Sequence, residues 1–503
     1  MRTIPVASHS AICDTQQIPL VINHSGGRKR DNRMTHSSLG WSPRIRSRFA
    51  EVRARRKRLC RATQCAIACL CISGMANGFV AERAGATPLQ YLVVPSPNGG
   101  SLGDGLSGVS CTGPNNCMAV GNDDGSANVV GETLAESWDG STWSIVSTPN
   151  PTVNGESEAV LNAVSCTEPD NCIAVGFNQT FDSQETSTLI ESWDGSTWSI
   201  VPNPNAANSN DSGLNSVSCT GPNNCMAVGS FGSTVLGDIP NQTLVESWDG
   251  STWSVLPSPN PDPNFNALTS VSCTAANSCM AVGYVATGAE DLALSWDGTS
   301  WSVLPTPDPG SRGNYLDGVS CIDANDCMAV GDYINTGSQN QTLVESWNGS
   351  DWSIVPSPSP GITYSYLDAV SCVDSLSGCV AVGIASTGSV DQTLVESDTG
   401  GIWSVIPSAN NGGTNNDLAA ISCSDSSTCA AAGDFVSGTF DGVQPVDSTL
   451  VLTNYSSPPS GTPEAPATTL FPIAGSLVVY VVVVFRGRRK KRGFSFVARG
   501  AEG

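Results

Sequence analysis

Residues 214–229 read LNSVSCTGPNNCMAVG, and residues 243–261 read TLVESWDGSTWSVLPSPNP. Closely related text recurs along the 503-residue chain, and the copies are spaced by about 50 residues. A period of this length is typical of propellers and solenoids. The chain therefore contains one structural unit in seven copies, here called repeats 1 to 7. Their first cysteines are Cys111, Cys166, Cys219, Cys273, Cys321, Cys372 and Cys423.

Each repeat divides into four short segments typical of β-strands. In the copy quoted they are residues 214–219, 225–229, 243–248 and 252–256, and Asp249-Gly250 is a strong hairpin signal between the last two. No segment of the repeats has the period of an amphipathic helix. The pattern predicts an all-β fold, a seven-bladed β-propeller of four-stranded antiparallel blades. A β-solenoid is the alternative, and it would need caps at both ends.

The two ends of the repeated region favour the propeller. Repeat 7 has three strand segments, 419–423, 429–433 and 449–455, and no TWSV text. The missing text lies at the other end, where residues 91–98 read YLVVPSPN. We therefore predict that Leu92–Pro95 is the outer strand of the seventh blade and closes the ring, because an open sheet edge promotes association. A solenoid has no use for this strand.

Fourteen of the nineteen cysteines form seven close pairs, and regular pairing of this kind is typical of disulfides in exported proteins. Zinc is the alternative, but the repeats contain no histidine and the spacing fits structural zinc poorly. We expect no cofactor, apart from weak binding of divalent cations by the acidic repeats. The predicted pairs are Cys111–Cys117, Cys166–Cys172, Cys219–Cys225, Cys273–Cys279, Cys321–Cys327, Cys372–Cys379 and Cys423–Cys429.

Charge is unevenly distributed along the chain, whose formal net charge is −22. Residues 84–485 contain 40 Asp and Glu and one basic residue, Arg312, whereas residues 2–61 contain 14 Lys and Arg. An acidic region of this kind does not bind phosphate backbones, so no nucleic-acid partner is expected there. Repulsion between like charges favours solubility, and we expect the exported part to be monomeric.

The flanking segments indicate export and anchoring. Residues 65–81 are apolar, follow a basic run and precede Ala84-Gly85-Ala86, which is the order of a secretory signal peptide, with Met34 as an alternative start. Residues 470–485 are apolar and uncharged, and a basic run follows them, so we predict a membrane span with the propeller outside the cell. The predicted organisation is 1–86 basic leader and signal peptide, 87–456 propeller, 457–469 Pro/Ser/Thr-rich stalk, 470–485 transmembrane helix and 486–503 basic cytoplasmic tail.

The C-terminal order also resembles bacterial cell-surface sorting signals, although the Leu-Pro-x-Thr-Gly pentapeptide is absent. A processed sorting signal and a stable membrane anchor are both open. Either one places the protein at the cell surface.

The turn SWDGSTW at residues 247–253 resembles the Asp-box of sialidase-like propellers, but it lacks one residue between Asp and Gly. The resemblance implies a structural role for the turn, with the Asp carboxylate accepting backbone N–H groups. A calcium site is the alternative. The complete layout resembles actinobacterial secreted and surface β-propeller repeat proteins, with Asp-box or Kelch-like blades. The turn residues are Asp139, Gly140, Asp194, Gly195, Asp249, Gly250, Asp297, Gly298, Asn348 and Gly349.

The sequence nominates no catalytic residue. Histidine-dependent triads and phosphate-binding loops are absent from the repeats, and sialidase chemistry needs a cluster of arginines. The loops between second and third strands vary most, and loops on a rigid scaffold commonly carry function. We therefore predict a non-enzymatic surface module for binding, adhesion or scaffolding that recognises a glycan or a protein through this variable face. The alternative is a carboxylate-based carbohydrate-active enzyme, a glycoside hydrolase or lyase.

Overall fold

The computed structural model describes residues 90–100, 103–125, 131–151, 157–180, 185–206, 209–233, 239–285, 290–310, 313–440 and 444–454. The chain divides into two compact units, Met1–Ala86 and Thr87–Gly503, and every described residue belongs to the second. The predicted signal peptide, stalk, transmembrane helix and tail lie outside the described residues. Among the residues that are described, no helix is long and apolar enough to cross a membrane.

The described part is a β-propeller of repeated four-stranded antiparallel sheets, with one 3-10 turn, η1 (Leu376–Gly378). The first strands of repeats 1 to 7 are β2 (Asp104–Gly113), β6 (Ser157–Glu168), β10 (Asp211–Gly221), β14 (Asn266–Ala275), β18 (Asn314–Asp323), β22 (Ser365–Ser371) and β26 (Thr414–Asp425). The second strands are β3 (Asn116–Asp123), β7 (Asn171–Thr180), β11 (Asn224–Ser233), β15 (Ser278–Val285), β19 (Asp326–Ile334), β23 (Val380–Ser386) and β27 (Thr428–Phe440).

Third and fourth strands complete each sheet. The third strands are β4 (Glu132–Trp138), β8 (Glu185–Trp193), β12 (Ile239–Trp248), β16 (Glu290–Trp296), β20 (Asn340–Trp347), β24 (Asp391–Asp398) and β28 (Gln444–Thr453). The fourth strands of repeats 1 to 6 are β5 (Trp143–Ile145), β9 (Trp198–Ile200), β13 (Trp253–Val255), β17 (Trp301–Leu304), β21 (Trp352–Ile354) and β25 (Trp403–Val405). The first and second strands extend beyond the predicted bounds, because their ladders continue past the alternating core segment. A single bridge, Asp211 to Thr186, links repeats 2 and 3 into one eight-stranded sheet.

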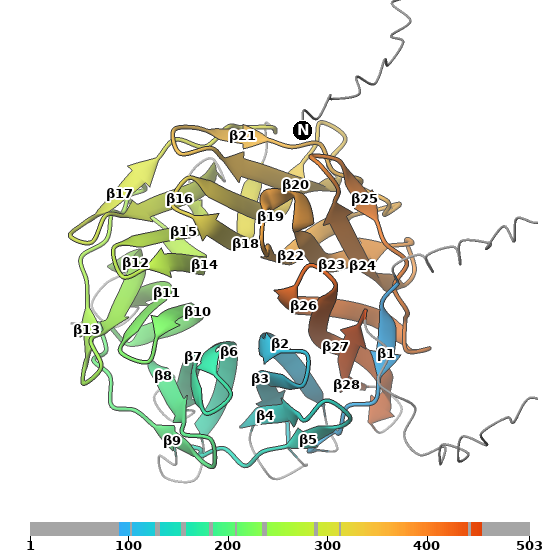
Figure 1. The fold of residues 1–503 in the computed structure, drawn as a ribbon, viewed down its shortest axis with the longest axis horizontal. Helices are drawn as coiled ribbons and strands as arrows, with labels where there is room; N and C mark the ends of the chain where they lie inside the picture. The colour runs from blue at the N-terminus through green and yellow to red at the C-terminus, as the bar shows by residue number, and fades with distance from the viewer. Residues whose placement is uncertain are drawn as a thin grey trace, which may run out of the picture. The chain divides into compact units, whose positions relative to one another are not determined.

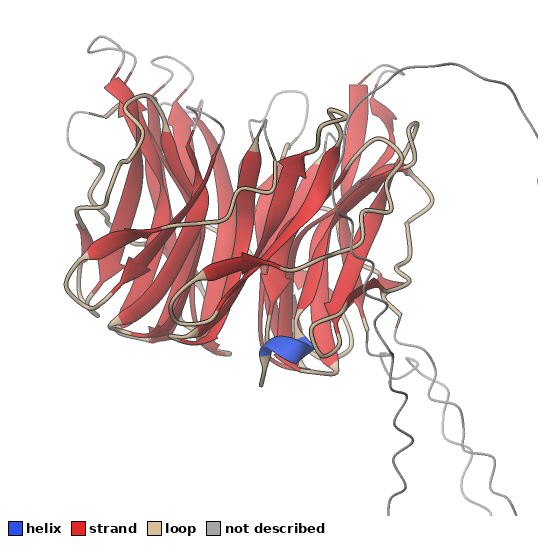
Figure 2. Cartoon of the chain, turned by 90° about the horizontal axis from the view of Figure 1, so that it is seen from above, coloured by secondary structure: helices blue, strands red, loops and turns tan. Residues whose placement is uncertain are grey.

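The first strands lie innermost and the fourth strands outermost (Figure 1). The strands run between two faces, and η1 lies at the face of the disulfide loops (Figure 2). Neighbouring sheets share apolar cores: Val175 and Ile190 of repeat 2 pack with Leu214 and Leu244 of repeat 3. A glycine follows each Ala-Val pair of the second strand because the first strand passes very close. A Cβ atom on Gly229 would lie 2.0 Å from the carbonyl oxygen of Gly213.

The N-terminal strand β1 (Leu92–Val94) pairs antiparallel with β28, with Val93 opposite Leu452. The segment after it repeats the contacts of the other repeats. The backbone N–H of Thr449 donates to Asn98 Oδ1 at 2.9 Å, as the N–H of Thr243 donates to Asn260 Oδ1 at 2.7 Å. The N-terminal segment therefore supplies the fourth strand of repeat 7.

One hydrogen bond recurs at every junction between repeats. A backbone N–H of the first cysteine donates to the Ser hydroxyl that precedes the equivalent cysteine of the previous repeat, as Cys166 does to Ser110 at 3.0 Å. The same bond joins Cys111 of repeat 1 to Ser422 of repeat 7 at 2.9 Å. Leu106 and Val109 of repeat 1 also share an apolar cluster with Val451 of repeat 7.

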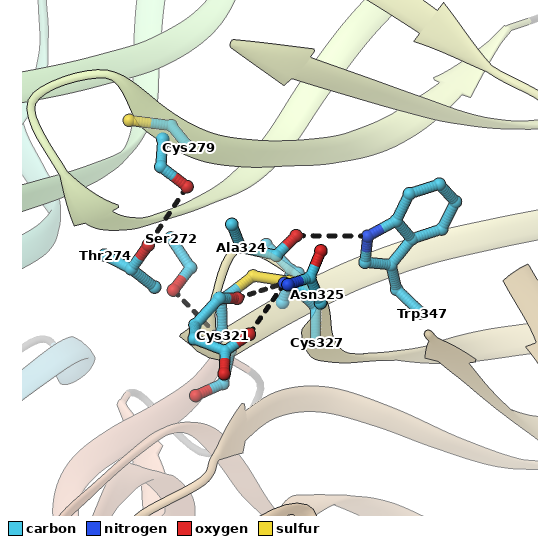
Figure 3. Close-up of a disulfide and its surroundings, with 12 residues drawn as sticks. Ser272, Thr274, Cys279, Cys321, Ala324, Asn325, Cys327 and Trp347 are labelled. Carbon is cyan, nitrogen blue, oxygen red and sulfur yellow. Dashed lines mark hydrogen bonds between the residues drawn. A yellow bond between two sulfur atoms is a disulfide. The ribbon is translucent and has the colours of Figure 1, made fainter. Parts of the chain in front are cut away.

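All seven disulfides lie at the pairs expected from the spacing, with Cα–Cα distances of 4.0 to 4.1 Å. Six of them bond cross-strand neighbours where the first strand ends and the second begins, as Cys321 and Cys327 do. The cysteines of the remaining pair, Cys372 and Cys379, lie just outside β22 and β23. Figure 3 shows the Cys321–Cys327 disulfide beside two structural hydrogen bonds. The N–H of Cys321 donates to Ser272 Oγ, and the indole N–H of Trp347 donates to the Ala324 carbonyl.

Candidate functional site

The predicted variable face contains the ends of the second strands and the starts of the first and third strands. Its loops in repeats 1, 2, 3, 4 and 7 lie partly or wholly outside the described residues. The described part of this face consists of strand ends and the loops of repeats 5 and 6.

Tyrosines gather on this face. Of the six tyrosines that the structure describes, five belong to repeats 4, 5 and 6, and we call them the tyrosine group. All five side chains are half-buried. Tyr284 lies edge-on to Tyr315 across the junction of repeats 4 and 5, with ring centroids 5.2 Å apart. The complete group is Tyr284, Tyr315, Tyr333, Tyr364 and Tyr366.

Two further contacts order the tyrosine group. Tyr364 and Tyr366 stack with ring centroids 5.0 Å apart, and the Tyr364 hydroxyl donates to Asp391 Oδ1 at 2.6 Å. This hydrogen bond to a carboxylate raises the pKa of Tyr364, and burial raises that of Tyr366. Both phenols therefore stay protonated at neutral pH and present donors as well as aromatic faces.

A cavity lies on the axis of the propeller near the tyrosine group, because Tyr284 is close to Asp317 of the cavity lining. The cavity has a volume of about 180 Å³, and residues of all seven first strands line it. In each first strand a register shift four residues before the first cysteine leaves one residue out of the ladder, as at Asp317 between Leu316 and Gly318. These seven residues, the axial positions, are Ser107, Asn162, Asn215, Thr269, Asp317, Asp368 and Ala419.

Repeats 5 and 6 differ from the others at the axis. They read Tyr-Leu-Asp at residues 315–317 and 366–368. No other repeat combines Tyr at the first of these three positions with Asp at the third. The tyrosine group and the axial carboxylates are therefore parts of one asymmetric site.

Burial dominates the electrostatics of the axial carboxylates. Burial, together with the nearby charge of Asp332, raises the pKa of Asp317 to about 7. The pKa of Asp368 lies well above the usual range, because the carboxyl is buried and Asp417, Asp317 and Asp332 are close. Burial likewise raises the pKa of Asp332 and Asp417 to about 6. The site therefore holds several carboxyls that are only partly ionised at neutral pH.

The turn residues named from the sequence lie elsewhere, at separate exposed corners of the disulfide face. Asp249 Oδ1 accepts the backbone N–H groups of Ser251 and Thr252, each at 2.8 Å, and Gly250 has φ +91°. Hydrogen bonds from Thr252 and Ser251 lower the pKa of Asp249 to about 2. Asn348 makes the equivalent bonds to Ser350 and Asp351. Because the turn itself satisfies these oxygens, their contacts are structural.

The glutamates that recur in the third strands are also buried at equivalent positions and are not brought together. Ser96 donates to Glu136 Oε2 at 2.6 Å. Burial raises the pKa of all five, to between about 7 and about 9. The five are Glu136, Glu191, Glu246, Glu345 and Glu396, each with no exposed surface.

Two cavities on the disulfide face lie between repeats 1 and 2 and between repeats 4 and 5. The second has a volume of about 460 Å³ and is lined by the Cys321 disulfide loop, Trp296 and Trp347 (Figure 3). The cavity between repeats 1 and 2 has a volume of about 90 Å³ and is lined by equivalent residues. Two of them are larger: Pro169 takes the place of Ala324, and Asn116 that of Ser278. Their lining recurs round the propeller and belongs to the framework. Within the described residues no group of three acidic, Cys or His side chains could hold a metal ion.

Sequence reasoning named the face but missed the axial carboxylates and the tyrosine group. The signal lay in the alignment of the repeats on their first cysteines. Six residues before this cysteine the repeats read Gly, Val, Gly, Ala, Tyr, Tyr and Asp, and four residues before it, at the axial position, they read Ser, Asn, Asn, Thr, Asp, Asp and Ala. The sequence shows that the residue type varies at this position although the residues after it are nearly constant. Only the fold shows that the axial position faces the cavity.

Comparisons with known proteins assign the chain to no family. No protein-family profile and no curated protein matches the sequence. Solved structures with a similar fold include YCF48 bound to D1 peptide, at 10% identity and a TM-score of 0.42, covering 72% of this chain and 96% of that one. YCF48 from Cyanidioschyzon merolae matches at 15% identity and 0.42, covering 72% and 98%. Chaetomium thermophilum Sqt1 bound to the N-terminus of the ribosomal protein L10 matches at 10% and 0.40, covering 73% and 98%.

Proposed function

We propose that this protein is a surface-anchored, exported binding module, a closed seven-bladed β-propeller that recognises a glycan or protein outside the cell. The concentration of tyrosines on one side of the predicted face is the observation that carries the proposal. Tyrosine combines a large apolar area with a hydroxyl donor and loses little conformational entropy on binding, so it is enriched in recognition surfaces. A framework requirement would repeat these tyrosines round the propeller, as it does Trp253, whose equivalents occur in all of repeats 1 to 6.

Closure of the ring supports the proposal, because it fixes the site. The recurrent Ser-to-Cys hydrogen bond, the apolar cluster of repeats 1 and 7, and the pairing of β1 with β28 all favour a continuous ring. A closed ring holds side chains of several blades in one geometry, which lowers the cost of ordering them on binding. We further propose that the ring is monomeric and that residues 470–485 anchor it.

A binding array tests the proposal. The full chain, in mild detergent, is applied to an array of glycans, cell-wall fragments and surface proteins. Tyr315→Ala and Tyr366→Ala should each weaken the binding at least tenfold, as expected for central aromatic contacts. The matched control is Val160→Ala, which alters the same ring position in repeat 2. Equal binding by all three variants would refute the assignment of the site.

The axial carboxylates favour a second candidate function, a carbohydrate-active enzyme. Glycoside hydrolysis needs one carboxyl that is protonated and one that is ionised, and Asp317 and Asp368 lie in a setting that raises their pKa. Hydrolysis of a polysaccharide that is lost in both Asp317→Asn and Asp368→Asn would establish this alternative. Binding without turnover would exclude it.

A further inference from the structure

The axial positions of repeats 2, 3 and 4 make one shared contact. Each side chain donates a hydrogen bond to a leucine carbonyl of the next first strand, and this bond ties neighbouring blades together at the axis. The bonds run from Asn162 to Leu214 at 2.8 Å, from Asn215 to Leu268 at 2.8 Å and from Thr269 to Leu316 at 2.6 Å. Repeats 5 and 6 have aspartate at this position, and a carboxyl has no proton to donate once it is ionised. In that state Asp317 and Asp368 lack the contact that asparagine supplies at the same position in repeats 2 and 3.

Near these aspartates, two carboxylate oxygens have no hydrogen-bond partner. Asp368 keeps part of its surface open to the axial cavity, but its Oδ2 atom is enclosed and accepts no hydrogen bond. Asp417 Oδ1, beside it, is also enclosed and without a donor. An enclosed carboxylate without a partner is costly, and a cation inside the cavity removes that cost.

We propose that the axial cavity receives a lysine or arginine side chain of a protein partner, which passes the tyrosine group and pairs with Asp317 and Asp368. This inference rests on the proposed function and names the partner chemistry of the same site. Tyr284 lies close to Asp317 and can contact the cation through its ring face. A long basic side chain suits a cavity of about 180 Å³ whose lining includes the carboxyls of Asp317 and Asp368.

Other groups around the cavity set the pH dependence of this binding. Besides the two axial carboxyls, they are Asp332 on β19, Asp391 on β24, Asp417 on β26, Asp434 on β27, and the phenols of Tyr284 and Tyr366. None of these carries positive charge. A bound cation therefore favours ionisation of the carboxyls, so binding should release protons and weaken as pH falls below about 7.

The test compares charged and neutral peptides of matched size. Acetyl-Gly-Arg-Gly-amide and acetyl-Gly-Lys-Gly-amide are titrated into the full chain, in detergent, at pH 8 and low salt, with citrulline and norleucine peptides as neutral partners. Binding is followed by calorimetry in two buffers of different ionisation enthalpy. We expect the charged peptides to bind at least tenfold more tightly than the neutral ones, and to release protons.

The fold itself provides conservative variants. Asp317→Asn and Asp368→Asn install the residue that Asn162 and Asn215 already show to be compatible with this position, so folding should persist and binding of the charged peptides should fall at least tenfold. The control Asn162→Asp adds a carboxylate at the same ring position in repeat 2. It should not restore binding to Asp368→Asn.

Several outcomes would overturn the inference. Arginine and citrulline peptides could bind equally tightly, or Asp368→Asn could bind the charged peptides as the parent does. Tighter binding of these peptides by Arg312→Gln would also overturn it, because the chain's own guanidinium would then occupy the site. Binding of glucosamine but of neither basic peptide would assign the cavity to a cationic sugar. If the tyrosine variants abolish array binding while no basic peptide binds, this inference fails and the proposed function stands.

Discussion

Replacing Glu396 by glutamine should change how the stability of the propeller depends on pH. Glu396 has no exposed surface, and neither carboxylate oxygen has a hydrogen-bond partner. Burial raises its pKa from 4.5 to about 8. Between these two values the folded state holds a proton that the unfolded state releases, so the free energy of unfolding falls as pH rises.

The magnitude follows from the pKa. Each pH unit above 4.5 costs about 1.4 kcal/mol of stability, which amounts to about 3 kcal/mol at pH 7 for a group that remains protonated in the fold. Glutamine has no such proton, so Glu396→Gln should gain about 3 kcal/mol relative to the parent between pH 4.5 and pH 7. The position tolerates an uncharged residue, because Leu294 and Leu452 occupy it in repeats 4 and 7.

Guanidinium unfolding of residues 87–454 at several pH values between 4.5 and 8.5 measures this effect, with disulfides intact. Exposed Glu290→Gln serves as the control and should leave the pH profile unchanged. Parallel profiles of the parent and Glu396→Gln across this range would refute the reasoning, since they would mean that the buried carboxyl binds no extra proton in the folded state.

Three further predictions concern the framework. Deleting residues 87–97 should remove β1 and the contact of Asn98 with Thr449, so that the exposed edge of β28 causes aggregation and loss of cooperative melting. A variant that is monomeric by light scattering and melts like the parent by circular dichroism would refute the role of the strand. Replacing both Cys321 and Cys327 by alanine should cost about 2 kcal/mol in guanidinium unfolding, because the disulfide closes a short loop, and an unchanged midpoint would contradict this. Asp249→Ala should lower the melting temperature, because it removes the acceptor of two backbone N–H groups in the turn. In the parent the stability that this carboxylate contributes is present above pH 4 and is lost as the pH falls toward 2, so a variant as stable as the parent at pH 7 would contradict the prediction.

Much of the framework could be predicted because its rules are local. Four strand segments per repeat, the hairpin turn at Asp249-Gly250 and the cysteine pairs all follow from spacing along the chain, and the structure contains them. The fourth-strand text at residues 91–98 is a longer-range signal, but it too is readable, because it copies a segment of the repeat. Strand bounds were less accurate, since the ends of long first and second strands depend on neighbours in the sheet.

The site was much less predictable. The face was predicted from loop variability, yet most of those loops lie outside the described residues, and the residues that define the site belong to strands. The register shift that leaves Asp317 out of the ladder of β18 has no signature in a single segment of sequence. Asp317 and Asp368 lie 51 residues apart in sequence and line one cavity only because their first strands are neighbours at the axis.

The sequence by itself determined the repeat, its strands, its disulfides and its turns, because each depends on residues within about ten positions of one another. The tertiary structure alone decided that Asp317 and Asp368 of two neighbouring repeats line a shared axial cavity and that Asp368 Oδ2 is enclosed without a partner. The physical reason is that burial and proximity of charges are properties of the packed sheets and not of any one of them. No stretch of sequence carries them, since the groups that enclose Asp368 come from repeats 5, 6 and 7.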